Sequence, residues 1–189
     1  MCAACLSGSA AESLALCRLR EALVPHDLAH EAMLTIVWHS RTGGAAAMAQ
    51  AVAEGGGREA RLIAADDATP ELLRGAGGYV FVAPENLGSL SGAMKEMFDR
   101  CYYPLLGRVE GRAYATVIAA GSDGHGAQAQ IDRIVTGWRL RRVADPIIVN
   151  FAAQTPEAIL ARKEVPQDAL TACRELGEAM AEGLRLGIF

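Results

Sequence analysis

Long apolar runs are missing from this sequence: none approaches the roughly 20 residues that a helix needs to cross a bilayer. A surplus of basic residues is missing too, because 18 Lys and Arg face 22 Asp and Glu for a net charge of −4. This balance argues against a nucleic-acid partner. The first residues also lack the basic and apolar segments of a secretory signal. We therefore expect a cytoplasmic protein with neither a membrane nor a nucleic acid as its partner.

A disulfide framework is missing as well. The cysteines form an odd, scattered set of five: Cys2, Cys5, Cys17, Cys101 and Cys173. We interpret them as reduced thiols. Cys2 and Cys5 have the spacing of a redox or zinc motif, but no second pair lies at a useful distance, so we assign the spacing to chance. His26 and His30 fall short of H-E-x-x-H, and a solvated helix face explains them better. No metal site is predicted.

Residues 1–32 differ from the rest of the chain. They are rich in Ala and Leu but show no strand pattern, and Met33 stands directly before the first clear strand. A chain of 189 residues is long enough for one α/β domain with a sizeable core. We therefore predict an N-terminal extension over 1–32, helical or poorly ordered, and a single domain over 33–189.

From Met33 onward, short β-branched runs alternate with segments whose apolar residues recur at helical spacing, a pattern typical of helices covering a parallel sheet. The predicted strands cover residues 34–38, 59–65, 79–83, 114–120 and 147–151. The predicted helices lie around residues 45–52, 70–74, 92–101, 131–138 and 166–186. Right-handed crossovers then predict an α/β fold: a doubly wound, five-stranded parallel sheet in the order 2-1-3-4-5, with helices on both faces.

Three connections that follow predicted strands are rich in Gly, Ser, Thr or Asn: 39–45, 84–92 and 121–127. In an open parallel sheet, ligands bind where the connections at the carboxyl ends of the strands diverge. The opposite connections are more ordinary in composition. The sequence therefore predicts a binding site at the carboxyl edge of the sheet.

The first of these connections has the composition of a phosphate-binding loop. Hydroxyls and glycines at a strand-to-helix turn leave backbone N–H groups pointing outward at the positive end of a helix dipole, which suits a phosphate dianion. A Walker loop needs a Lys that is absent here. A dinucleotide fingerprint needs G-x-G-x-x-G, whereas Gly43 and Gly44 are adjacent, although Asp66 lies near the distance of the ribose acid. A third design fits better.

The segment S-R-T-G-G-A, residues 40–45, resembles the [ST]-x-[ST]-G-x-[ST] loop of the flavodoxin superfamily, which wraps the phosphate of FMN. Residues 83–100 look like the stretch of flavodoxin-like NAD(P)H-dependent reductases in which the loop after strand three borders the flavin ring. Residues 119–134 are similar to their Gly-rich loop at the pyrimidine edge. The resemblance implies an FMN site made of Ser40, Arg41, Thr42, Gly43, Gly44, Ala45, Pro84, Glu85, Asn86, Leu87, Gly88, Ser89, Gly121, Ser122, Asp123, Gly124, His125 and Gly126.

The sequence departs from this pattern in two ways. Ala45 replaces the last hydroxyl of the phosphate loop, so backbone donors must carry more of the binding. The ring-flanking segments have Asn86 and Leu87 where electron-carrying flavodoxins usually stack aromatics, and the composition is not strongly acidic. The resemblance therefore implies an FMN-dependent oxidoreductase that uses NADPH or NADH and reduces a small-molecule acceptor such as a quinone or free flavin. A flavodoxin-like carrier or regulatory protein is the alternative, and a scaffold that has lost FMN is a third.

Several residues near these motifs have simpler interpretations. Ser91 is first of all a helix N-cap. Whether His125 is an ordinary loop residue or lies at the flavin edge stays open. No acid/base catalyst is evident, and hydride transfer through a flavin needs none.

Aromatic residues outside the loops are expected in packing or in an interface. Tyr102, Tyr103 and Trp138 are the candidates, because a homodimer partner could wall off an otherwise shallow site. The basic run at 138–142 has no interleaved aromatics or glycines, so we interpret it as a solvated helix end rather than a nucleic-acid patch.

Overall fold

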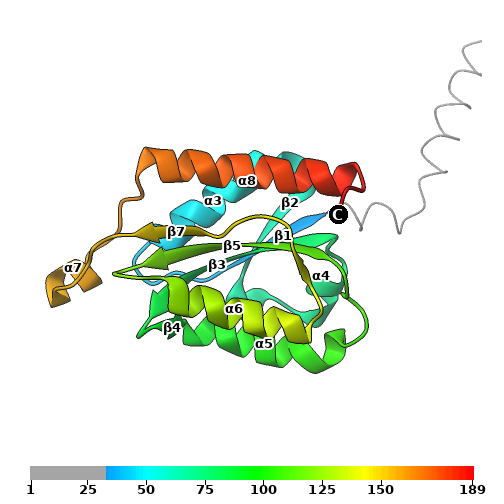
Figure 1. Ribbon diagram of the computed structural model, residues 1–189, viewed down its shortest axis with the longest axis horizontal. Helices are drawn as coiled ribbons and strands as arrows, with labels where there is room; N and C mark the ends of the chain where they lie inside the picture. The colour runs from blue at the N-terminus through cyan, green and yellow to red at the C-terminus, as the bar shows by residue number, and fades with distance from the viewer. Residues whose placement is uncertain (1–32) are drawn as a thin grey trace, which may run out of the picture.

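The computed structural model describes residues 33–189 (Figure 1). The predicted extension over 1–32 lies outside the described residues, and so do Cys2, Cys5, Cys17 and the His26–His30 pair. Cys101 and Cys173 are buried free thiols, which agrees with the prediction of reduced cysteines.

The predicted sheet is present, with its five main strands parallel and in the predicted order. These strands are β1 (Leu34–Trp38), β2 (Ala60–Ala64), β3 (Gly78–Asn86), β5 (Ala113–Ala120) and β7 (Ile147–Asn150). Parallel pairs join β2 to β1, β1 to β3, β3 to β5 and β5 to β7, which confirms the order 2-1-3-4-5. Two short additions bring the sheet to seven strands: β4 (Ser89–Leu90) and β6 (Arg141–Arg142).

Both additions correct the sequence-based predictions. Residues 84–92 were expected to form a loop, but β3 extends to Asn86 and β4 folds back onto it in an antiparallel pair. The basic run at 138–142 was expected to end a helix, but its last two residues pair with the start of β5, where Arg141 lies opposite Ala113. In both places the open edge of a neighbouring strand supplies backbone partners, and those partners outweigh weak local preferences.

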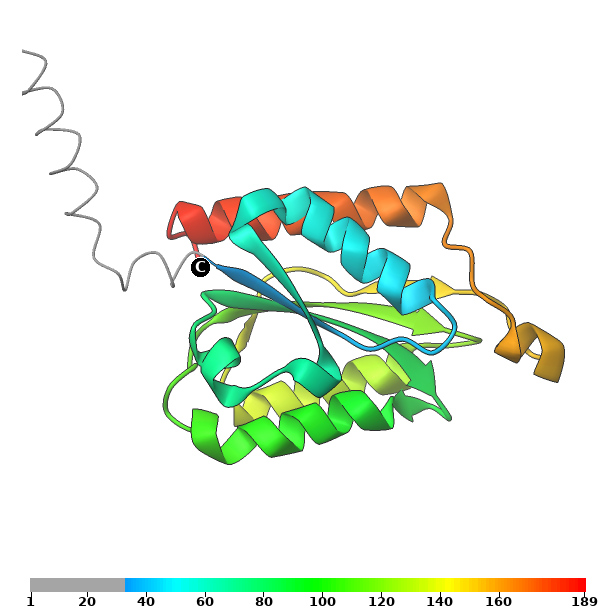
Figure 2. The same cartoon turned by 180° about the vertical axis from the view of Figure 1, so that it is seen from behind.

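Helices cover both faces of the sheet (Figures 1 and 2). On one face lie α3 (Gly44–Gly56) and α8 (Gln167–Arg185), and on the other lie α4 (Pro70–Arg74), α5 (Gly92–Leu105) and α6 (His125–Gly137). The short helix α7 (Pro156–Leu160) was not predicted and stands beyond the carboxyl ends of the strands. Within residues 33–189, no helix is long and apolar enough to span a bilayer.

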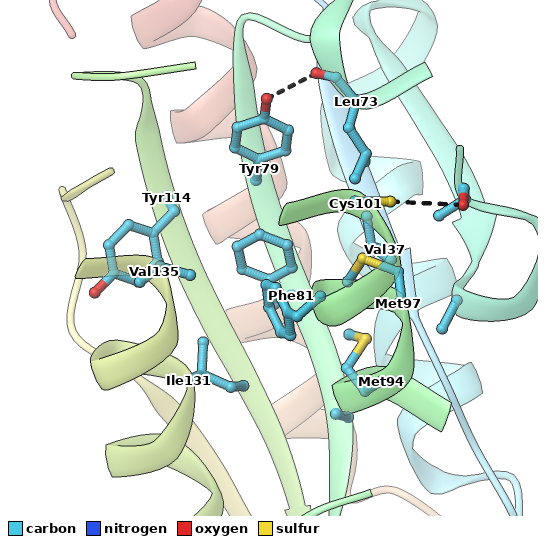
Figure 3. Close-up of a cluster of buried hydrophobic side chains, with 14 of the residues drawn as sticks. Val37, Leu73, Tyr79, Phe81, Met94, Met97, Cys101, Tyr114, Ile131 and Val135 are labelled. Carbon is cyan, nitrogen blue, oxygen red and sulfur yellow. Dashed lines mark hydrogen bonds between the residues drawn. The ribbon is translucent and has the colours of Figure 1, made fainter. Parts of the chain in front are cut away.

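The two faces of the sheet carry side chains of different size. Strand residues alternate between faces, so Tyr79 and Phe81 point toward α5, where Phe81 contacts Phe98 with ring centroids 4.9 Å apart (Figure 3). The face under α3 and α8 receives mainly Ala and Val from β5. These small residues allow the two helices to lie close to the sheet and to each other.

Glycine at the α3–α8 crossing is a packing requirement. A Cβ on Gly177 would lie 2.0 Å from the carbonyl oxygen of Val52, and one on Gly55 would lie 1.9 Å from that of Arg174. No side chain larger than hydrogen fits there. This contact holds α3, whose first turn forms part of the candidate site, against the last helix.

Candidate functional site

The three predicted connections converge at one edge of the sheet. β1, β3 and β5 are adjacent and parallel, with Trp38 paired to Val82 and Val82 to Val117, so the segments that follow them leave the same edge. We call this edge the rim; it consists of residues 39–45, 84–91 and 121–126. The structure therefore brings the predicted site residues together at one edge of the sheet.

The first rim segment is a strand-to-helix turn with outward amides. Gly43 is the N-cap of α3 with φ +90°, and its N–H donates to the Ser40 hydroxyl at 3.1 Å. Gly44, Ala45 and the next residue form the first turn of the helix, where N–H groups have no partner in the preceding turn. A Cβ on Gly44 would lie 3.0 Å from the ring of Phe151, so this position too has little room. The donors fit a phosphate group, as the motif predicts.

A pocket of about 470 Å³ lies beside this loop. Its lining residues come from the loop, from the first turns of α3 and from the segment after β7: Arg41, Thr42, Gly43, Ala46, Ala47, Leu160 and Arg162. Two guanidinium groups and no carboxylate line it. The electrostatic character of the pocket is therefore suited to an anion.

The second rim segment is a tight hairpin. Leu87 and Gly88 form its two-residue turn with φ of +53° and +69°, the signs that a type I′ turn requires. The Leu87 side chain is fully exposed to solvent, with an exposed fraction of 104%. Glu85, one of the residues expected to border the flavin ring, accepts hydrogen bonds from the N–H groups of Gly124 at 2.8 Å and Ala127 at 3.0 Å. It therefore caps α6.

The third rim segment is held directly against that hairpin. Gly124 is the N-cap of α6 with φ +95°, and a Cβ on Gly126 would lie 2.1 Å from the carbonyl oxygen of Gly88. Ser122 and Asp123 are exposed. His125, expected in the loop, is the exposed first residue of the helix. The hairpin and the start of α6 thus form one packed unit.

Hydrogen bonds extend around the rim to the segment after β7. The side-chain amide of Asn150 donates to the carbonyl of Ser122, and the N–H of Ala153 donates to the carbonyl of Gly121 at 2.7 Å. Farther along, the N–H of Lys163 donates to the carbonyl of Thr42 at 2.8 Å. Residues 151–163 therefore connect the third rim segment back to the first.

The sequence alone did not predict the hydrogen bond that links the first and second rim segments. Ser91 stands at the N-cap position of α5, as predicted, but its side chain makes no capping bond. Its buried hydroxyl shares a hydrogen bond with Nδ1 of His39 at 2.9 Å. Burial lowers the pKa of His39 and the charge of Arg41 lowers it further, against a raising effect of Asp66. Only the place of His39 directly after β1 could have drawn attention to it.

The aromatic residues that were expected in packing or in an interface lie away from the rim. Trp138 is only 4% exposed and packs edge-on against Phe98, with ring centroids 5.3 Å apart, so it belongs to the core and not to an interface. Tyr102 and Tyr103 are near the carboxyl end of α5, at the opposite edge of the sheet from the rim. Tyr103 alone of the three is largely exposed, at 77%.

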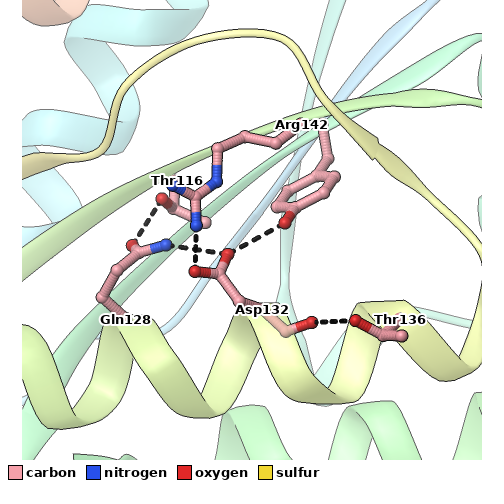
Figure 4. Close-up of polar contacts among 6 residues, drawn as sticks. Thr116, Gln128, Asp132, Thr136 and Arg142 are labelled. Carbon is pink, nitrogen blue, oxygen red and sulfur yellow. Dashed lines mark hydrogen bonds and ion pairs between the residues drawn. The ribbon is translucent and has the colours of Figure 1, made fainter.

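A polar network fastens α6 to the sheet behind the rim (Figure 4). Asp132 accepts hydrogen bonds from the Tyr114 hydroxyl at 2.8 Å and from the Gln128 amide at 3.0 Å, and it pairs with Arg142. Thr116, buried on β5, donates to the Gln128 carbonyl at 2.5 Å. This network explains why β6 forms, because it gives Arg142 a partner on α6.

Comparisons with known proteins agree with this geometry. The model of the NADPH-dependent FMN reductase family matches residues 64–145. A protein named flavodoxin from Aquifex aeolicus (strain VF5) is 31% identical over 156 residues, covering 78% of this chain and 84% of that protein. Solved structures also share the fold, and two examples follow. A flavodoxin from the domain Archaea has a TM-score of 0.65 at 17% identity, covering 81% of this chain and 99% of that one. The WrbA-like flavodoxin from Agrobacterium tumefaciens has a TM-score of 0.59 at 22% identity, covering 81% and 97%.

The fold and the rim define an α/β protein of the doubly wound type, with a glycine-rich helix start directly after β1. The sequence identity to the Aquifex protein extends over most of both chains and shows the family. This chain belongs to the flavodoxin-like family, as its three motifs predicted.

Proposed function

We propose that this chain is an FMN-dependent NAD(P)H oxidoreductase that passes electrons to a quinone, free flavin or a similar small acceptor. The family assignment supports the flavin, and the match to the NADPH-dependent FMN reductase model supports the nicotinamide reaction. That match spans the hairpin and the start of α6, the two parts of the rim expected to flank the ring.

The residues that would hold FMN follow from the donor set of the rim. The Thr42 and Ser40 hydroxyls and the first-turn amides from Gly44 onward would bind the phosphate, because hydroxyls and free amides gather at this helix N-terminus. The hairpin and residues 121–126 would flank the ring. When bound, FMN supplies the redox chemistry, accepting a hydride from the nicotinamide and passing electrons on.

The single observation that carries the reductase proposal is the aromatic-free rim. None of the three rim segments contains Phe, Tyr or Trp, and the tip of the hairpin presents the fully exposed Leu87. A nicotinamide ring must stack on the flavin with reacting atoms about 3–3.5 Å apart. Because the rim has no aromatic side chain that could stack on the flavin ring, one face of the ring would stay open to a substrate.

The protein itself would orient the flavin and its substrates and exclude water from the site. Glu85 fixes the hairpin against α6, and the His39–Ser91 hydrogen bond fixes the start of α5 against β1. We include a homodimer in the proposal, because an exposed rim gains shelter from a partner's surface. Light scattering of the purified protein measures this directly, and a monomer at micromolar concentration contradicts it.

The test is anaerobic stopped-flow mixing of the FMN-loaded protein with NADH and with NADPH, followed at the oxidised-flavin absorbance band. Bleaching at a catalytically useful rate, with recovery of the band when a quinone is added, is the expected result. A flavin that accepts electrons only from dithionite or from a reductase partner contradicts the proposal.

The second candidate is an electron carrier without its own nicotinamide reaction. The observation that favours it is the name of the 31% identical relative, flavodoxin. In the same experiment a carrier gives no bleaching with either nicotinamide, and its stepwise reduction passes through a stable one-electron state.

We also propose that residues 33–189 form the flavin-binding unit and that the protein is cytoplasmic. A chain beginning at Met33 is expected to unfold cooperatively and to bind FMN as the full chain does. Loss of either property in the truncated chain would show that the first 32 residues belong to the domain.

A further inference from the structure

We propose that Arg162, together with Arg41, binds a phosphate monoester in the pocket beside the 40–45 loop. This inference rests on the proposed flavin site and adds to it a residue from a distant part of the chain, which none of the three motifs contains.

The backbone before α8 places Arg162 at the loop. The N–H of the next residue, Lys163, donates to the carbonyl of Thr42 at 2.8 Å. The ammonium of Lys163 turns away and donates to the carbonyls of Ala158 and Ala161 at 2.6 and 2.7 Å. Lys163 thus orders the segment, and its own charge is used to cap α7. The guanidinium of Arg162 is left on the side of the pocket.

The side chain of Arg162 lies against the glycine at the helix start. A Cβ on Gly43 would be 3.7 Å from Cγ and 3.9 Å from Nε of Arg162. Arg41 lines the same pocket of about 470 Å³, and no carboxylate does. The arginine side chains therefore stand beside the amides that the first turn of α3 presents.

Neither arginine has an acidic partner within the part of the chain that the structure describes. Ion pairs there engage other arginines: Arg58, Arg100, Arg139, Arg142, Arg174 and Arg185. Two unpaired guanidinium groups beside helix N-terminal amides match a dianion with several acceptor oxygens, because guanidinium binds phosphate through paired N–H donors.

Two phosphate monoesters are available to the proposed enzyme. One is the 5′-phosphate of FMN, and the other is the 2′-phosphate that distinguishes NADPH from NADH. Both present the same chemistry, and substrate pairs that differ only in that group tell them apart: FMN against riboflavin, and NADPH against NADH.

The experiment compares the wild-type protein with R162Q and R41Q. R133Q is the matched control, since Arg133 is exposed on α6 and lies on the other face of the sheet. Fluorescence titration of the flavin-free protein gives Kd for FMN and for riboflavin, and steady-state kinetics give KM for NADPH and NADH. Thermal unfolding followed by circular dichroism checks that each variant is folded, and R162K tests whether charge alone restores binding.

We expect R162Q to weaken one phosphate-bearing ligand by about tenfold or more, the usual effect of losing a charge-assisted hydrogen bond. If FMN weakens while riboflavin does not, the phosphate is that of the flavin. If KM for NADPH rises while KM for NADH does not, it is that of the nicotinamide. Equal changes within both pairs, or no change in any ligand, overturn the role of Arg162 but leave the proposed function intact. A wild-type protein that binds neither flavin overturns both.

Discussion

Glu85 and Gly124 are joined across the rim: one carboxylate oxygen of Glu85 accepts the N–H of Gly124 at 2.8 Å, and the other accepts the N–H of Ala127 at 3.0 Å. Residues 39 positions apart thereby form an N-cap. The carboxylate satisfies two of the amides that a helix start leaves unpaired and interacts favourably with the helix dipole. The hairpin and α6 are expected to move, and to unfold, together.

E85Q tests this link. Glutamine keeps the shape but turns one acceptor into an NH₂ group and removes the charge, so the unfolding free energy should fall by about 1–2 kcal/mol. Urea denaturation followed by circular dichroism measures the change. E175Q, at an exposed carboxylate on α8, should remain within about 0.5 kcal/mol of wild type. Equal stability of E85Q and wild type would mean that the cap contributes nothing.

G43V tests the proposed phosphate-binding loop, residues 40–45. Gly43 has φ +90° and starts α3, a conformation that a β-branched residue adopts only with strain, and the methyl groups would occupy the approach to the first-turn amides. FMN affinity, measured by fluorescence titration, should fall by about tenfold or more. G107V carries a similar strain at φ +71°, with nothing within 4 Å, and should bind FMN as wild type does. Unchanged FMN affinity in G43V would remove this loop from the site.

G177A tests the packing of α3 against α8. The added methyl group would lie 2.0 Å from the Val52 carbonyl oxygen, and because backbone must move to admit it, the unfolding free energy should fall by about 2–4 kcal/mol. G92A adds the same methyl group at the start of α5, where nothing lies within 4 Å, and should be neutral or slightly stabilising. The thermal midpoints of the two variants give the comparison, and equal midpoints would contradict the close approach.

The pH dependence of stability should report His39. Burial and the Arg41 charge lower its pKa, so the unfolded chain binds this proton more readily than the folded one. Above the unfolded pKa of about 6.5, His39 is neutral in both states and does not lower the unfolding free energy. As the pH drops below that value toward the lowered folded pKa, the unfolded chain takes up the proton first, so the unfolding free energy falls. H39N should flatten this part of the profile. A profile identical in H39N and wild type would assign the effect to other groups.

The two described cysteines should be unreactive in the folded protein. Burial raises the pKa of the Cys173 thiol to about 11 and also raises that of Cys101, so at pH 8 few thiolates exist to react. Iodoacetamide labelling with peptide mass spectrometry should find both modified only after denaturant is added. Rapid native labelling of Cys173 would show that α8 separates readily from α3.

Much of the architecture could be predicted because it depends on local patterns. The β-branched runs predicted β1, β2, β3, β5 and β7, and right-handed crossovers limited their order to the one observed. The glycines and hydroxyls of residues 40–45 predicted the helix start with outward amides, since those residue types are selected by backbone conformation itself.

What the tertiary structure decided was which distant polar groups meet. Periodicity indicates which residues are buried, but nothing in it pairs Glu85 with Gly124, His39 with Ser91, or Lys163 with Thr42. The hairpin at 85–90 and strand β6 exist because a neighbouring edge offers backbone partners. Likewise Arg162 lies beside residues 40–45 because the chain after β7 folds back over the rim. Such contacts depend on where helices and strands come to rest in space, and they therefore appear only once the sheet is assembled.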